Sequence, residues 1–144
     1  MAEKKQVIKV FDDDKKAEAN AAADPEEVGA DRYEALEVNA DNAQEIINTG
    51  KGVLKLSKKV ELNGEETDSI YFDLSGISAI KYRNIVKQVE RNNKRPVVDP
   101  TQDIDVQMAI FSEASGIPVA DLKTALSMKD AAKMNMVVYY FLAA

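Results

Sequence analysis

The sequence contains neither cysteine nor histidine. Without thiols it forms no disulfide framework and no thiolate metal site. Without imidazole, Ser-His and Cys-His catalytic pairs and histidine zinc sites are also excluded. No G-x-x-x-x-G-K-[ST] or G-x-G-x-x-G stretch is present, so there is no recognisable phosphate-binding loop. We therefore predict a protein that is not an enzyme and uses no cofactor, with a carboxylate-only mechanism as the remaining alternative.

Long hydrophobic runs are also missing. The N-terminal stretch MAEKKQVIKVFDDD lacks the apolar core of a signal peptide. The longest apolar run covers residues 137–144, whereas a transmembrane helix needs about 20 apolar residues. We therefore expect a soluble protein that makes no membrane contact and stays in the compartment where it is made.

Carboxylates are the remaining metal ligands, and Asp99, Asp103 and Asp105 lie close together in the sequence. A calcium loop beginning at Asp103 requires glycine at its sixth position and glutamate at its twelfth, where this chain has Met108 and Ala114. Acidic residues also favour the first turn of a helix, where the helix dipole stabilises negative charge. We therefore interpret the three carboxylates as helix-terminal charge and predict no metal site.

The net charge of −6 belongs to the N-terminal third of the chain. Residues 1–52 contain 13 acidic and 7 basic side chains, whereas residues 53–144 contain 12 of each. The first stretch is also poor in large apolar residues, so it buries too little surface to offset the entropy of ordering it. We predict a largely flexible acidic segment over 1–52 and a folded domain over 53–144. Weak strand and helix patterns at 7–11 and 31–47 leave transient or partner-induced structure as an alternative there.

From Val53 onward the pattern has a period of two, which indicates a hairpin. The large apolar side chains of both strands stand at even positions: Leu54, Leu56, Val60, Leu62, Ile70, Phe72 and Leu74. A two-residue turn at Asn63-Gly64 would pair Leu62 with Glu65 and set even positions against odd ones. We therefore predict an odd loop of three or five residues around Asn63-Gly64.

Helices are predicted after the hairpin. The first begins at a Ser75 or Ser78 cap, continues to about Asn92 and turns one apolar stripe inward, made of Ile77, Ile80, Ile85 and Val89. A second begins at Thr101 or Asp99, because acidic residues then occupy its first turn. The predicted fold class is α+β, a β-hairpin followed by about four helices and preceded by the flexible acidic segment.

Start signals for the last two helices follow. Gly116 closes the preceding helix, and Pro118 suits the first turn of the next. Ser127 and Asp130 have the spacing of a capping box, in which two side chains satisfy each other's backbone donors. The final helix is therefore expected to begin at Met128.

The order of these signals resembles the bacteriophage tail assembly chaperones of contractile-tailed phages. The C-terminal series of that family is met here by Gly116-Ile117-Pro118, Asp121-Leu122, Leu126, Asp130 and Phe141-Leu142. With the hairpin, the resemblance covers residues 53–142. It implies a viral protein of the bacterial host cytoplasm that binds the tape measure protein and keeps it soluble during tail assembly. It also implies displacement by the tail tube protein as the tube grows, with no catalytic step.

The final helix carries the first predicted binding surface. It is apolar on every side, with only Asn135 interrupting residues 134–142. A small domain seldom encloses such a helix completely, so part of its surface is expected to contact another chain or, by self-association, a second copy of this one. Some of these residues are expected to form the core, and we predict that partner contact uses Met136, Tyr139, Tyr140 and Phe141.

The second predicted surface is a basic stripe of Arg83, Lys87 and Arg91 on the first long helix. Such a stripe is typical of a solvated face, but it also suits the chain's own acidic segment, an acidic partner or phosphate. A small nucleic-acid-binding or regulatory domain using residues 81–95 is therefore one alternative function, and a structural virion subunit is another. The acidic total charge and the lack of a known nucleic-acid motif disfavour nucleic-acid binding.

Overall fold

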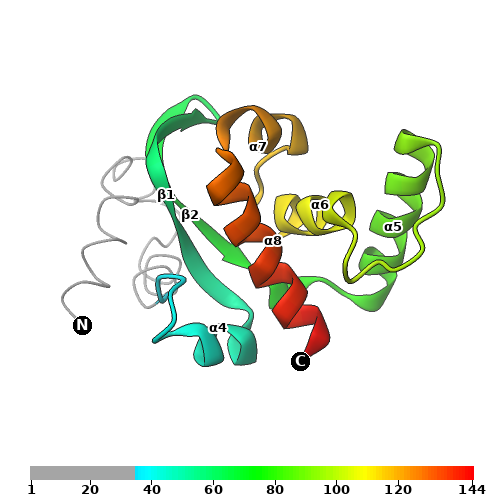
Figure 1. Cartoon of the computed structure of the whole chain (residues 1–144), viewed down its shortest axis with the longest axis horizontal. Helices are drawn as coiled ribbons and strands as arrows, with labels where there is room; N and C mark the ends of the chain where they lie inside the picture. Colours follow the sequence, from blue (N-terminus) through cyan, green and yellow to red (C-terminus); the bar gives the residue numbers. More distant parts are fainter. Residues whose placement is uncertain (1–34) are drawn as a thin grey trace, which may run out of the picture.

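The computed structural model describes residues 35–144, which form a two-stranded antiparallel hairpin and five α-helices (Figure 1). The elements in chain order are α4 (Ala43–Thr49), β1 (Lys51–Leu62), β2 (Glu65–Asp73), the short 3-10 helix η1 (Leu74–Gly76), α5 (Ala79–Asn93), α6 (Ile104–Ser115), α7 (Val119–Ala125) and α8 (Met128–Ala143). The predicted α+β class, a hairpin followed by four helices, is confirmed. The predicted strand pattern at residues 7–11 lies outside the described residues.

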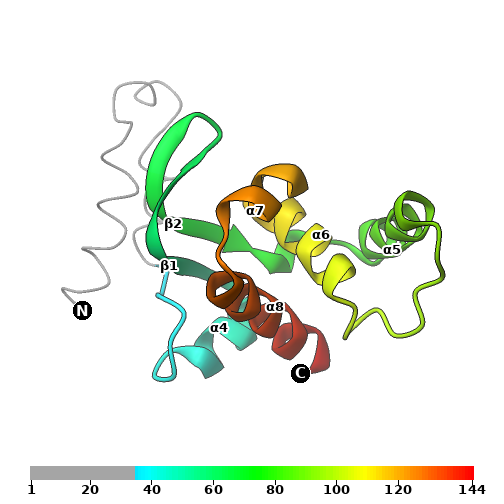
Figure 2. The same ribbon diagram turned by 45° about the horizontal axis from the view of Figure 1, so that its top comes forward.

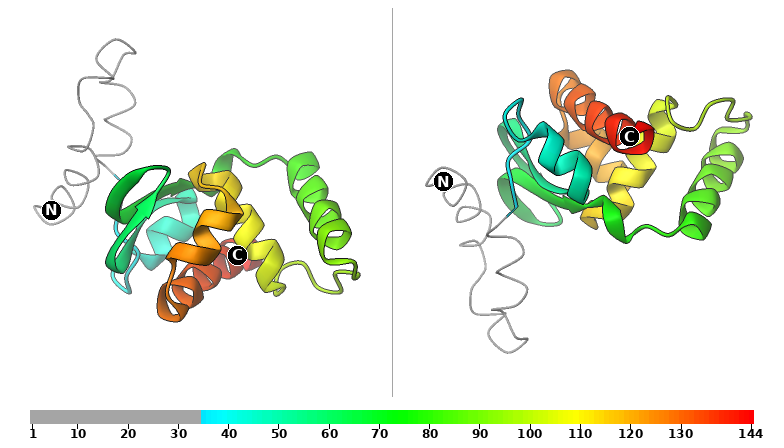
Figure 3. Two further views of the ribbon diagram at one scale, coloured as in Figure 1. Left: turned by 90° about the horizontal axis from the view of Figure 1, so that it is seen from above. Right: turned by 90° about the horizontal axis from the view of Figure 1, so that it is seen from below.

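Helices α6, α7 and α8 pack against the hairpin, whereas α5 packs against α6 and lies farthest from the strands (Figures 1 and 2). The core lies between the hairpin and these helices. Its centre includes the Phe72 ring of β2 and the Phe111 ring of α6, whose centroids are 5.2 Å apart. Figure 3 shows α4 and α5 on opposite sides of the molecule, so surfaces built on them are separate.

Side-chain caps set the beginnings of the long helices. The Ser78 hydroxyl accepts the Lys81 N–H at 3.1 Å, so Ser78 is the cap of α5 and the other predicted candidate, Ser75, lies in η1. Helix α6 begins later than predicted, because the Asp103 carboxylate accepts the N–H groups at the helix start and makes Asp103 the cap. The inward stripe predicted for α5 is wrong at Ile80, which is 72% exposed. Because α5 packs mainly against α6, its buried face is narrower than the apolar pattern suggests.

The hairpin turn is tighter than predicted. Leu62 pairs with Glu65, and both turn residues have positive φ, 53° at Asn63 and 82° at Gly64. This is a two-residue turn of the kind that Asn-Gly favours, so the predicted odd loop is wrong. The conflict between even and odd positions is removed within the strands instead. Lys55 pairs with Ser69 on one side of an irregular stretch, and Val60 pairs with Thr67 on the other side. The irregular stretch therefore contains more residues of β1 than of β2.

The extra residues of β1 change which positions face each other. Beyond the irregularity, Leu54 lies opposite Ile70, and both side chains are buried. The two even apolar rows therefore meet on the core side although the turn has two residues. An irregular stretch in the middle of a strand replaces the longer loop that the pattern predicts.

Helix α8 holds this irregular stretch. The Ser57 backbone N–H donates to both carboxylate oxygens of Asp130, at 3.0 and 3.2 Å, and its hydroxyl donates to the same group at 2.9 Å. Asp130 is 2% exposed. One half of the predicted capping box is confirmed, because the Ser127 hydroxyl accepts the Asp130 N–H at 3.1 Å. In place of the reciprocal bond, the Asp130 carboxylate satisfies a β1 backbone donor that the irregular pairing leaves free.

The folded body begins earlier than predicted, because residues 35–52 belong to it. Val38 N–H donates to the Val53 carbonyl at 2.9 Å, and Val53 N–H donates to the Leu36 carbonyl at 2.8 Å. Ile46 of α4 is 4% exposed and is part of the main core. A Cβ at Gly52 would lie 2.9 Å from the Phe72 ring, so glycine permits this close approach. The domain boundary predicted at residue 53 is therefore wrong, because the folded domain includes α4.

Candidate functional site

Helix α8 divides into a core face and an exposed face. Asp130, Met134 and Val138 lie one turn apart and are buried. On another side of the helix, Met136 is 53% exposed and Tyr140 is 49% exposed. A helix that is apolar all round thus uses one face for the fold, and within residues 35–144 another face stays exposed.

The four predicted partner residues differ in burial. Met136 and Tyr140 lie on the exposed face, whereas Tyr139 and Phe141 are half-buried. The Tyr139 and Tyr140 rings contact each other edge to face, with centroids 5.3 Å apart. Phe141 packs against the core cluster and so contributes to the fold as well as to the surface.

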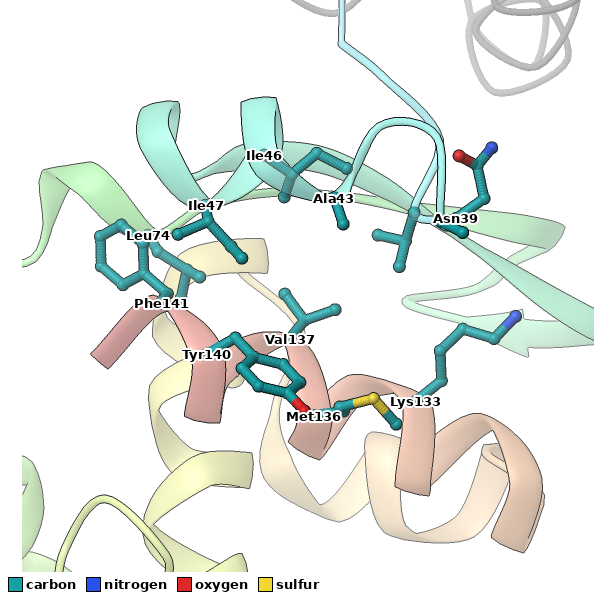
Figure 4. A pocket seen from close by; sticks show the side chains of 12 residues that line it. Asn39, Ala43, Ile46, Ile47, Leu74, Lys133, Met136, Val137, Tyr140 and Phe141 are labelled. Atoms are coloured by element: carbon teal, nitrogen blue, oxygen red, sulfur yellow. The ribbon is translucent and has the colours of Figure 1, made fainter. Parts of the chain in front are cut away.

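An apolar pocket of about 370 Å³ lies between α4 and α8, beside the exposed face of α8 (Figure 4). Figure 4 shows Tyr140, Val137 and Phe141 on one side of it, facing Ala43, Ile46 and Ile47 of α4 on the other. The full lining comprises Val38, Asn39, Ala40, Ala43, Ile46, Ile47, Leu74, Lys133, Met136, Val137, Tyr140 and Phe141. Three of the predicted partner residues, Met136, Tyr140 and Phe141, therefore line a single site.

The sequence analysis missed the α4 side of this pocket. Ala43 and Ile47 belong to the near-helical pattern at residues 31–47, which was assigned to the flexible acidic segment. The local pattern was the available signal. Its pairing with α8, about 90 residues later in the chain, is a tertiary contact that no local pattern encodes.

Lys133 is the charged residue of the pocket lining and stands at one end of it (Figure 4). Its Nζ donates to the Lys55 carbonyl oxygen at 3.2 Å. No carboxylate of residues 35–144 forms a salt bridge with it. An ammonium has three donors, so two N–H groups of Lys133 remain for a ligand.

The basic stripe lies on α5, on the other side of the molecule from the pocket (Figure 3). Arg83, Lys87 and Arg91 are all exposed. Arg91 donates to the Gln88 side chain at 3.2 Å, and no salt bridge joins the three basic groups to an acid within the described part of the chain. The structure brings them together on one solvated face and keeps them apart from the α8 residues.

Arg95, which follows α5, is used within the fold. Its guanidinium donates to both Asp103 oxygens, at 2.8 and 3.1 Å, and to Asp105 at 2.7 Å. The hydrogen bond from Arg95 holds the pKa of Asp103 below its usual range, and the backbone N–H bonds from the start of α6 act in the same direction. Asp103 and Asp105 therefore serve as helix-terminal charge, as predicted, while Asp99 caps a turn at Thr101.

The described residues thus carry two separate candidate binding surfaces, the pocket beside α8 and the basic face of α5. No helix among residues 35–144 is long and apolar enough to cross a bilayer. The same residues contain no cluster of three or more acidic side chains placed to hold a metal ion. Comparisons with models of protein families, with curated proteins and with solved structures found no match.

Proposed function

We propose that this protein is a phage tail assembly chaperone that binds the tape measure protein and keeps it soluble while the tail is assembled. The observation that supports it best is the uncovered apolar surface of α8 at Met136 and Tyr140, next to an apolar pocket. Binding to such a surface needs no catalytic group. A partner bound there has its own apolar side chains covered, and those side chains would otherwise cause it to aggregate.

The adaptability of this surface fits the same role. Methionine changes shape at little cost, and tyrosine offers a large apolar ring with a polar end. A tape measure protein is long and helical in the family that the chain resembles, so its chaperone must accept several related helical segments. A surface built on Met136 and Tyr140 suits partners that share chemistry more than they share sequence.

The test is co-expression of the full chain with the tape measure protein encoded beside it. Replacing Tyr140 by aspartate places a charge in the apolar surface, so captured, soluble tape measure protein should fall about tenfold or more. The matched control is Ile80→Asp, which puts the same charge at a 72% exposed apolar position on α5. We expect that control to capture as much partner as the wild type. Unchanged capture by a folded Tyr140→Asp variant would count against the proposal.

The exposed basic face of α5 supports a second candidate, a nucleic-acid-binding or regulatory domain. If Arg83, Lys87 and Arg91 contact phosphates, affinity must fall steeply with added salt, because each contact releases counterions. We expect negligible binding of labelled DNA or RNA near about 150 mM salt, because the basic charges are balanced within residues 53–144 and screened beyond about 8 Å.

A polarisation titration of the wild type decides between the two candidates. Micromolar or tighter binding that weakens with salt, and that is lost when all three basic residues become glutamine, would favour the nucleic-acid function. If the chaperone proposal is right, the same triple variant should retain capture of the tape measure protein, since α5 lies away from the pocket.

A further inference from the structure

The pocket beside α8 has the form of a groove between two helices. Its wall on the α4 side is low, because Ala43 of α4 and Ala40, which precedes the helix, line it with short side chains. Its wall on the α8 side includes the larger side chains of Met136 and Tyr140, which are about half exposed. The short side chains on the α4 side leave room for another backbone to approach closely along α8.

The exposed face of α8 has helical spacing. Ala132, Met136, Tyr140 and Ala143 are all exposed and follow one another at intervals of four, four and three residues. This stripe runs along the helix beside the groove. Intervals of three and four are those at which an approaching helix presents its own side chains, so the stripe matches a helix better than an extended strand.

Lys133 makes the two ends of the groove chemically different. Glu45 of α4 and Asp41, which precedes the helix, are exposed but do not line the pocket. Lys133 does line it and retains donors for an acid at one end of the groove. An apolar floor with one cation at its end is complementary to an apolar stripe that ends beside a carboxylate.

We propose that the groove between α4 and α8 binds an amphipathic helix whose apolar stripe ends beside an acidic side chain, which pairs with Lys133. The proposal rests on the proposed function, in which that helix belongs to the tape measure protein. Its apolar side chains at i, i+3 or i+4 and i+7 enter the groove and cover Met136 and Tyr140. The acid fixes which end of the partner helix lies toward Lys133.

The experiment uses the full chain and two synthetic helical peptides of about 18 residues, long enough to form helix in isolation. Both carry leucines at i, i+3, i+4 and i+7, and they differ only in a glutamate or a lysine beside one end of that stripe. Fluorescence anisotropy should show that the glutamate peptide binds the wild type about two- to fivefold more tightly, as expected for an exposed ion pair. Added salt should reduce that preference.

A pair of variants on α4 locates the site. Ala43→Phe fills the groove from its low wall and should weaken both peptides about tenfold or more. Gln44→Phe adds the same ring one residue later, at an exposed position outside the pocket lining, and should leave both affinities within about twofold of the wild type. Equal binding by these two variants would place the peptides elsewhere and overturn the proposal.

Lys133 variants test the charge. Lys133→Gln should remove the preference for the glutamate peptide, whereas Lys133→Arg should keep it because the positive charge stays. Because Lys133 also bonds to Lys55, melting temperatures of both variants are measured beside the affinities. A preference that survives in a folded Lys133→Gln variant would overturn the proposal. So would sedimentation showing that the wild type alone is a dimer that Ala43→Phe dissociates, since a second copy would then occupy the groove.

Failure of this inference differs from failure of the proposed function. If Ala43→Phe still captures the tape measure protein but Tyr140→Asp does not, the chaperone function stands and the groove proposal is wrong. If the peptides bind as described but the wild type captures no tape measure protein, the groove binds amphipathic helices and the chaperone function is wrong.

Discussion

Replacing Asp130 by alanine is expected to lower the free energy of unfolding by about 2–3 kcal/mol, which is large for a single polar residue. The buried Asp130 carboxylate accepts a bifurcated hydrogen bond from the Ser57 backbone N–H and a second bond from the Ser57 hydroxyl. Alanine leaves that backbone donor without its partner in the irregular part of β1. Chemical denaturation of the full chain measures the loss, and a loss below about 1 kcal/mol would contradict this role.

A matched control separates this contact from the general effect of an acid near a helix start. Asp121 lies in the first turn of α7, as Asp130 lies in the first turn of α8. Asp121→Ala should cost only the helix-dipole contribution of about 0.3–1 kcal/mol. Ser57→Ala removes the hydroxyl bond alone and should cost about 1 kcal/mol, with a clear coupling to Asp130→Ala in a double-mutant cycle.

Removing residues 1–50 is expected to destabilise the protein strongly, by about 3 kcal/mol or more. The deletion takes away Ile46, which is 4% exposed, and the bonds that join residues 36–38 to β1. It also uncovers Leu74 and Phe141, which line the pocket opposite α4. This reverses the expectation from the sequence, which placed the folded boundary after residue 52.

The comparison for this deletion is a chain that begins at residue 35 and so retains α4. It loses the most acidic stretch, whose composition predicts little contribution to stability. Thermal melting of both truncated chains and of Ile46→Ala, for which we expect a loss of about 2–4 kcal/mol, assigns the effect to α4. Melting temperatures for the two truncations within about 2 °C of each other would show that α4 is dispensable.

The hairpin illustrates how far local patterns reach. The even spacing of apolar residues predicted both strands, and Asn63-Gly64 predicted the turn. The predicted turn length was wrong because we assumed that even positions of β1 face even positions of β2 along the whole hairpin. An irregularity between residues 55 and 60 breaks it, and that irregularity is held by Asp130 of α8, 73 residues from Ser57.

Local patterns also predicted one side of the candidate site and missed the other. Its α8 side was predicted because Met136, Tyr140 and Phe141 exceed what a small core encloses. Its α4 side was missed because the surrounding segment is acidic, and composition outweighed a short helical pattern. A seven-residue helix is marginal alone and is stable here because Ile46 packs in the core.

The sequence by itself determined that thiol and imidazole groups are absent, the α+β class and the start residue of α8, and it limited the cap of α5 to Ser75 or Ser78. These depend on composition or on contacts within one helical turn, such as Ser127 with the N–H of Asp130. Only the tertiary structure decided which face of α8 is buried, that α4 belongs to the fold, and that both helices enclose a pocket with Lys133 at its end. Those features depend on packing between segments far apart in the chain. The energy of such a contact cannot be predicted from the residues that are neighbours in the sequence.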